Sequence, residues 1–149
     1  MRNFIKEKIR TSKVSRYPFP YLVIKNFIPK KDLISLKKKF PDFDDLDFND
    51  VLIPSKSCTK KSILPQSKLY KILLKTKPFN RLNKSLRSLE PQIKKKFAKY
   101  INIYVDKKYH KEKLKFHMAI ASMRKGYIKS PHTDRRDHLI HCLFYIQSE

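Results

Sequence analysis

The apolar residues of this chain come in short runs, and this feature limits its fold most. The longest run has five residues, Cys142 to Ile146, whereas a membrane-spanning helix needs about 20. Leu, Ile, Val and Phe nevertheless make up 44 of the 149 residues, above the roughly 20 per cent below which a charged chain stays disordered. We therefore expect a folded protein, with a single domain over residues 1–149.

The sequence also indicates where the chain resides. Its N-terminus begins basic but contains no apolar stretch of about 7 to 15 residues before a small-residue cleavage site, so secretion is not expected. Cys58 and Cys142 are the only thiols and fit no metal-binding spacing. A disulfide framework is therefore not expected, and the predicted compartment is the reducing cytoplasm, with no membrane partner.

The charge is strongly positive, with 36 Lys and Arg against 13 Asp and Glu and a net charge of +23. Such a charge attracts polyanions, nucleic acid above all. Only eight of these cations are Arg, the residue that phosphate and base recognition favours, and the Lys residues are spread along the chain. A Lys-rich composition with a solvated surface is the favoured interpretation, and a non-catalytic module that binds nucleic acid or another anion is the alternative.

Periodicity predicts the elements of the first two-thirds of the chain. Residues Pro20 to Pro29 alternate and contain β-branched and aromatic residues, which predicts a strand. A helix is expected over residues 30–40, with Leu33, Leu36 and Phe40 on one apolar face. Further helices are predicted from Gln66 to about Val105, the last with a core-facing stripe of Ile93, Phe97, Ile101 and Tyr104.

Five of the thirteen acidic residues lie between Asp42 and Asp50. This stretch lacks the central Gly and the closing Glu of a calcium-binding loop. We therefore expect an acidic surface loop that offsets neighbouring lysines.

The last third changes to strand patterns. Between residues 114 and 125, Leu114, Phe116, Met118 and Ile120 occupy one face, and a mostly apolar strand ends the chain. The predicted fold class is therefore α+β, helical over residues 1–113 and with strands over residues 114–149.

His132 and Asp134 are the candidate metal ligands. In an extended backbone their side chains share one face, about 6.6 Å apart along the strand. An imidazole and a carboxylate are two of the three ligands of the facial triad that binds non-haem Fe(II). On spacing alone, a surface turn containing Thr133 and Asp134 is the alternative.

The surrounding sequence carries a family resemblance. The run G-Y-x-x-x-P-H-T-D (Gly126 to Asp134), followed by polar residues and an apolar strand ending L-F-Y-I, resembles the iron-site strand pair of the 2-oxoglutarate- and Fe(II)-dependent dioxygenases, near the prolyl-hydroxylase-like branch. Residues 17–41 are similar to the entry strand and helix of that family. The resemblance implies a double-stranded β-helix, or jelly roll, with helices packed outside it. It further implies Fe(II) and 2-oxoglutarate as cofactors, His132 and Asp134 as iron ligands, and hydroxylation of a substrate that the sequence does not identify.

The sequence departs from the family after Asp134. The family places a second His, and then an Arg or Lys that pairs with 2-oxoglutarate, several tens of residues beyond the carboxylate, whereas fifteen residues follow here. We therefore expect an incomplete jelly roll that lacks activity alone. For His138 or His141 to act as the third ligand, the chain would have to fold back over the metal. The favoured alternatives are that His138 lies at a turn and that His141 faces the interior of the barrel.

Two tyrosines are candidate cofactor-binding residues. Tyr127 and Tyr145 could each direct a phenol at a 2-oxoglutarate carboxylate, with packing in the core or at its rim as the alternative. No residue is assigned as a catalytic group, because neither cysteine thiol has a positioned base.

Overall fold

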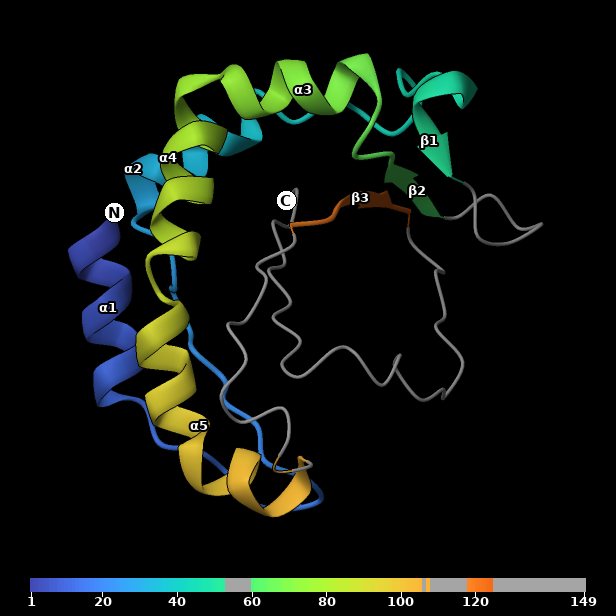
Figure 1. Cartoon of the computed structure of the whole chain (residues 1–149). Helices are drawn as coiled ribbons and strands as arrows, with labels where there is room; N and C mark the ends of the chain where they lie inside the picture. Colours follow the sequence, from blue (N-terminus) through green and yellow to red (C-terminus); the bar gives the residue numbers. More distant parts are fainter. Residues whose placement is uncertain (53–59, 106, 108–117, 125–149) are drawn as a thin grey trace.

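The structure, a computed structural model, describes residues 1–52, 60–105, 107 and 118–124. These residues form helices and an antiparallel sheet, so the chain is a mixed α and β protein, consistent with the predicted α+β class (Figure 1). The elements are α1 (Arg2–Thr11), α2 (Lys30–Lys37), the 3-10 helix η1 (Phe48–Asp50), β1 (Val51–Leu52), β2 (Lys60–Ile63), α3 (Lys68–Lys75), α4 (Lys77–Arg87), α5 (Glu90–Tyr104) and β3 (Ile120–Met123).

Local sequence explains the boundaries of the three central helices. The Ser67 side chain caps α3 by accepting a hydrogen bond from the Tyr70 amide at 3.1 Å. Thr76 ends α3 and precedes α4, and Pro78 lies in the first turn of α4, where a missing amide proton costs nothing. Pro91 has the same place in α5. The two prolines therefore mark the starts of α4 and α5, so the helical sequence from Lys68 to Tyr104 forms three helices and not one.

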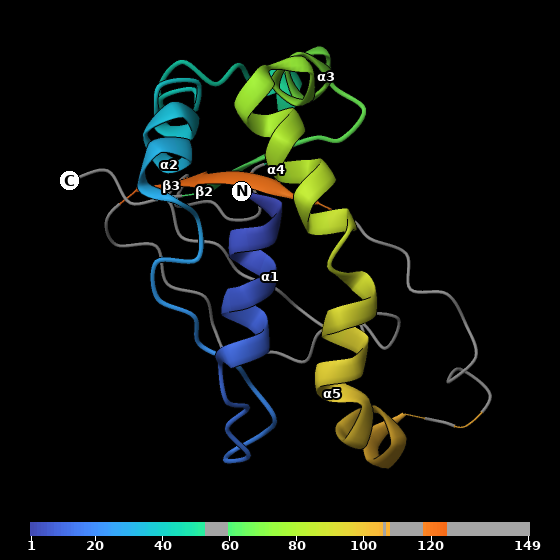
Figure 2. The same ribbon diagram turned by 90° about the vertical axis from the view of Figure 1, so that its left-hand side faces the viewer.

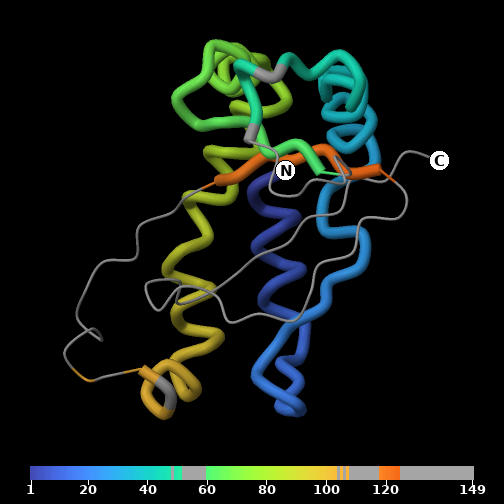
Figure 3. The backbone as a smooth tube through the Cα atoms, turned by 90° about the vertical axis from the view of Figure 1, so that its right-hand side faces the viewer, coloured from blue at the N-terminus to red at the C-terminus, as the bar shows by residue number. Residues whose placement is uncertain are grey.

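The helices are arranged around a shared core. α4 and α5 follow one another along one side of the molecule, and α1 lies beside both (Figure 1). α2 and α3 lie at one end, and α5 extends to the other (Figures 2 and 3). The largest fully buried side chains come from four different segments, which the core therefore joins: Phe79, Ile5, Leu36 and Leu89.

The sheet has the order β1-β2-β3, with β2 in the centre and both pairings antiparallel. Ile63 of β2 pairs with Val51 on one side and with Ile120 on the other. All three side chains are buried in the same core as the helices. One face of the sheet thus packs on the helical part of the chain.

The prediction of a strand over Pro20–Pro29 was wrong. Among the described residues this segment forms only one isolated bridge, Ser15 with Tyr21, and a turn with a positive φ of 51° at Asn26 interrupts it. The alternation itself is present, because Leu22 and Ile24 are half-buried while Tyr21 and Val23 are exposed. Side-chain alternation reports an extended backbone next to a core, and it does not report a hydrogen-bonded partner strand.

The prediction of a helical part over residues 1–113 also needs correction, because it did not include β1 and β2, which lie within these residues. β2 alternates in burial, with Lys61 and Ile63 facing inward. A lysine at an inward position hides the apolar period that identifies a strand in sequence. The helix α1 was not predicted either, although Ile5 and Ile9 form a buried pair at the i, i+4 spacing.

Other predictions are confirmed. α2 begins at Lys30 and buries Leu36, with Leu33 and Phe40 packed against the core. In α5 Ile101 is buried and Ile93 packs against the core. In β3 Ile120 is buried, as expected.

None of the helices that the structure describes combines the length and the apolar character that a membrane span requires.

Candidate functional site

The residues predicted to form the site lie outside the described residues. This holds for the candidate ligands His132 and Asp134, for His138 and His141, and for Tyr127 and Tyr145. The described chain reaches Arg124, at the end of the strand that leads toward the motif. The described groups nearest to the motif in the sequence are those that hold β3 in place.

Two contacts hold the ends of β3. Before the strand, the Tyr70 hydroxyl of α3 donates a 2.6 Å hydrogen bond to the Met118 carbonyl. After the strand, the Arg124 guanidinium forms an ion pair with the Asp44 carboxylate of the acidic loop. Between these contacts, β3 pairs with β2 from Ile120 to Met123. β3 is therefore held along its length by β2 and at each end by a side-chain contact.

The fold also changes the ionisation of Tyr70. Burial raises the pKa of its phenol, and the positive charge of Arg87 opposes this more weakly. The hydrogen bond to Met118 requires the protonated phenol as donor. The raised pKa therefore keeps the phenol protonated, and able to donate, to a higher pH than an exposed tyrosine would allow.

Lys61 is a buried cation in the central strand, with 7% of its surface exposed. Its ammonium donates to the Phe43 carbonyl at 2.9 Å and to the Leu46 carbonyl at 3.0 Å. A buried charge is costly unless hydrogen bonds compensate it. The two carbonyls supply such hydrogen bonds, and the same contacts hold the acidic loop against the sheet.

Phe43 adds a second link between the loop and the sheet. Its ring lies 4.8 Å from the Lys61 ammonium nitrogen and 4.5 Å from the guanidinium carbon of Arg124, measured to the ring centroid. Both distances are within the range of cation–π attraction. The loop thus contacts β2 through Lys61 and the end of β3 through Arg124. Asp44 pairs with this arginine, 80 positions away, and not with one of the neighbouring lysines that the sequence suggested.

Nothing in the described part of the chain groups three or more His, Cys, Asp or Glu side chains in a way that could hold a metal ion. Asp47 and Asp50 instead accept hydrogen bonds from backbone amides. Asp47 accepts from the Asn49 amide at 2.8 Å, and Asp50 accepts from the Leu69 amide at 3.4 Å. Candidate metal ligands therefore remain those of the H-x-D motif.

Sequence reasoning missed the roles of Lys61 and Tyr70. Tyr70 carries a detectable signal, because it follows a Ser N-cap by three residues and so belongs to the first turn of a helix. For Lys61 the run of lysines gives no indication of which side chain points inward. The partner carbonyls are more than a dozen residues away in sequence, so only the tertiary fold reveals them.

Comparison with known proteins gives no relative: no protein-family model, curated protein or solved structure matches this chain.

Proposed function

We propose that this chain is a 2-oxoglutarate- and Fe(II)-dependent dioxygenase-like protein, in which His132 and Asp134 bind the iron. The observation that carries the proposal is the run P-H-T-D at residues 131–134 within the longer pattern from Gly126 to the apolar strand near the chain end. An imidazole nitrogen and a carboxylate oxygen are a donor set that suits Fe(II).

Two features of the described fold support this proposal. In the segment similar to the family's entry strand and helix, residues 20–29 form no strand, but the helix is present as α2, whose Leu36 is fully buried. β3 precedes the motif as a strand of an antiparallel sheet, the kind of sheet from which a jelly roll is built. We propose that the strands beyond residue 124 continue this sheet as a jelly roll.

The proposed roles of the residues follow from their chemistry. His132 in its neutral form supplies a nitrogen ligand, and Asp134 supplies an oxygen ligand and neutralises part of the metal's charge. Tyr127 and Tyr145 are proposed to donate hydrogen bonds to a 2-oxoglutarate carboxylate. When bound, iron and 2-oxoglutarate supply the oxidation, and the protein binds and orients them. Hydroxylation by the whole site requires a third ligand and a cation for 2-oxoglutarate in addition to these residues.

Metal binding can be measured on the chain itself. Anaerobic calorimetric titration with Fe(II) should show one saturable site, and His132→Ala and Asp134→Ala should each weaken it at least about tenfold, because even residues that only support a ligand typically cost 10- to 100-fold. His117→Ala is the matched control, since it removes an imidazole outside the motif and should leave the affinity within about twofold. Equal losses in all three variants would contradict the proposal.

The alternative is a basic module that binds nucleic acid without catalysis, and the net charge of +23 is the observation that favours it. Binding to DNA or RNA that falls steeply with added salt, with no change when Fe(II) is supplied or His132 is replaced, would favour this alternative. Salt dependence and metal dependence thus separate the two functions in one set of titrations.

A further inference from the structure

Large apolar side chains are exposed in the segment that follows α1. Nine such side chains are exposed among the described residues, and four of them lie here at alternate positions: Tyr17 (87% exposed), Phe19 (63%), Tyr21 (37%) and Val23 (70%). We call residues 13–25 the aromatic segment. Single exposed apolar residues are ordinary on a protein surface, but a group of them in one place marks an interaction site.

The backbone holds these side chains in a closed loop. Ser15 and Tyr21 exchange two backbone hydrogen bonds, of 2.9 and 3.0 Å, so residues 16–20 form the tip of the loop. The rings of Phe19 and Tyr21 contact each other edge to face, with their centroids 6.0 Å apart and an interplanar angle of 63°. A partner of this segment therefore meets rings whose arrangement is already set, which lowers the entropy cost of binding them.

The surroundings of the rings are positively charged. Residues 8–31 contain seven Lys or Arg and no Asp or Glu, and residues 91–105 contain four Lys and no Asp or Glu. These two stretches meet, because the Lys96 ammonium of α5 donates to the Arg10 carbonyl at 2.9 Å, and the aromatic segment lies at the same end of the molecule as the C-terminal part of α5 (Figures 1 and 2). Within the described part of the chain, no carboxylate forms an ion pair with Lys13, Arg16 or Lys25. The charge here is therefore complementary to a polyanion.

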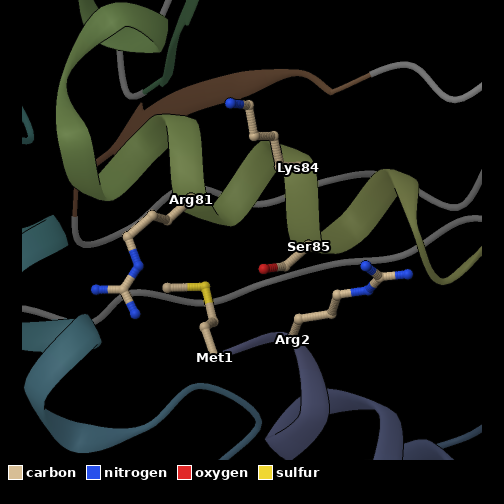
Figure 4. A pocket seen from close by; sticks show the side chains of 5 residues that line it. All are labelled: Met1, Arg2, Arg81, Lys84 and Ser85. Atoms are coloured by element: carbon tan, nitrogen blue, oxygen red, sulfur yellow. The ribbon is translucent and has the colours of Figure 1, made fainter.

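Positive charge alone does not distinguish this surface, because the start of α1 and the adjoining face of α4 are basic too. Met1, Arg2, Arg81, Lys84 and Ser85 line a hollow there (Figure 4). None of them is aromatic, Arg81 is already paired with Asp32 at 3.1 Å, and the guanidinium groups of Arg2 and Arg81 are directed away from Ser85. Exposed rings beside cations that no described carboxylate neutralises are what the aromatic segment has and the hollow lacks.

We infer that the aromatic segment binds single-stranded nucleic acid, with bases stacked on its three rings and phosphates facing its cations. Stacking rings within a positively charged surface are the two features of single-strand sites. A duplex hides the faces of its bases, so it would meet the cations alone. The inference does not rest on the iron site, and it deepens the nucleic-acid alternative by naming the surface and the kind of strand.

The course of the exposed side chains favours a strand over a membrane. They begin in the tip of the loop and continue beyond the backbone bridge to Val23. A flat lipid surface that touched the tip would leave the residues beyond the bridge in water, whereas an extended strand can follow all of them. Anionic lipid is therefore the competing outcome in the test.

The test is a fluorescence-anisotropy titration of a labelled oligo(dT), of about 12 nucleotides, with the full chain. EDTA is present, so the result does not depend on whether the iron site exists. Tyr17→Ala and Phe19→Ala should each weaken binding at least about fivefold, the lower end of what one stacked base contributes. Both rings are mostly exposed, so these variants should keep the stability of the wild type.

Two controls address the ring itself. Phe19→Tyr keeps an aromatic face and should bind within about twofold of the wild type, whereas Phe19→Leu keeps apolar bulk without that face and should bind as weakly as Phe19→Ala. Phe4→Ala removes an exposed ring near the start of α1, and it should leave the affinity within about twofold.

The charge is tested by the salt dependence of binding. Arg16→Gln should reduce the slope of log affinity against log salt concentration by about 0.7, the value for one phosphate contact with a single strand. Arg2→Gln removes the same charge at the hollow and should leave the slope unchanged.

The proposal is overturned if a duplex of the same length binds as tightly as the single strand, or if Phe4→Ala loses as much affinity as Phe19→Ala. Equal changes in slope for Arg2→Gln and Arg16→Gln would overturn it too, since only the net charge would then attract the strand. Phosphatidylserine vesicles that bind the wild type but not Tyr17→Ala, together with no binding of the oligonucleotide, would assign the segment to a lipid surface instead.

Discussion

Replacing Lys61 with methionine tests whether one buried cation holds the acidic loop on the sheet. Methionine keeps most of the apolar volume of the lysine stem but has no hydrogen-bond donor. The Phe43 and Leu46 carbonyls would each lose a charge-assisted hydrogen bond, and an unpaired buried acceptor costs about 1–3 kcal/mol. The cation–π contact with Phe43 contributes about 0.5–1 kcal/mol more.

Relief of the desolvation of the ammonium offsets part of this loss. We expect a net decrease of about 2 kcal/mol in the free energy of unfolding for Lys61→Met, which corresponds to a Tm lower by about 4–8 °C in a domain of this size. Urea unfolding followed by circular dichroism measures it. Lys71→Met removes the same charge from an exposed position on α3 and should stay within about 0.5 kcal/mol of the wild type. A Lys61→Met protein as stable as that control would refute the argument.

Three further predictions concern the helices and β3. For Tyr70→Phe, the loss of stability should be complete below a pH of about 10 and should shrink at higher pH. The reason is that the folded-state pKa of Tyr70 is raised above the unfolded-state value, so the stabilisation by this phenol disappears as the pH rises through the folded-state pKa. Denaturant unfolding of both proteins at several pH values measures the difference in stability, and a difference that is constant with pH would contradict this prediction. Ser67→Ala should cost about 1 kcal/mol by removing the N-cap of α3, measured by urea unfolding, whereas Ser67→Asp should retain most of the stability, and equal losses in both variants would speak against a capping role. Leu36→Ala should cost about 2–5 kcal/mol by opening a cavity in the core, while Ile34→Ala on the exposed side of α2 should cost much less; similar thermal shifts for both would show that α2 does not pack as described.

The sequence predicted those elements whose apolar period was uninterrupted. α2 buries Leu36, and in α5 Ile101 is buried and Ile93 packs against the core, because these residues recur at helical spacing with no competing signal. β2 was missed because Lys61 occupies an inward position, and its burial depends on carbonyls from a distant loop. The segment around Val23 alternates as a strand would, yet it has no ladder, because pairing depends on a partner that local sequence does not specify.

The candidate site divides in the same way. The H-x-D motif can be recognised from sequence, since two donors at a spacing of two share a face of an extended chain. The contacts that hold β3, from Tyr70 and from Asp44, join residues 48 and 80 positions apart, and no local pattern predicts them.

The most direct test of the proposed iron site is to follow the five histidines of this chain during a titration with Mn(II), a paramagnetic substitute for Fe(II). With selectively ¹⁵N-labelled histidine, we predict that the His132 ring signals broaden first, at substoichiometric Mn(II), while those of His110 and His117 stay sharp. In Asp134→Ala this selective broadening should disappear. Broadening that affects all five histidines equally, or that is unchanged in Asp134→Ala, would contradict the assignment of His132 and Asp134 as a joint metal site.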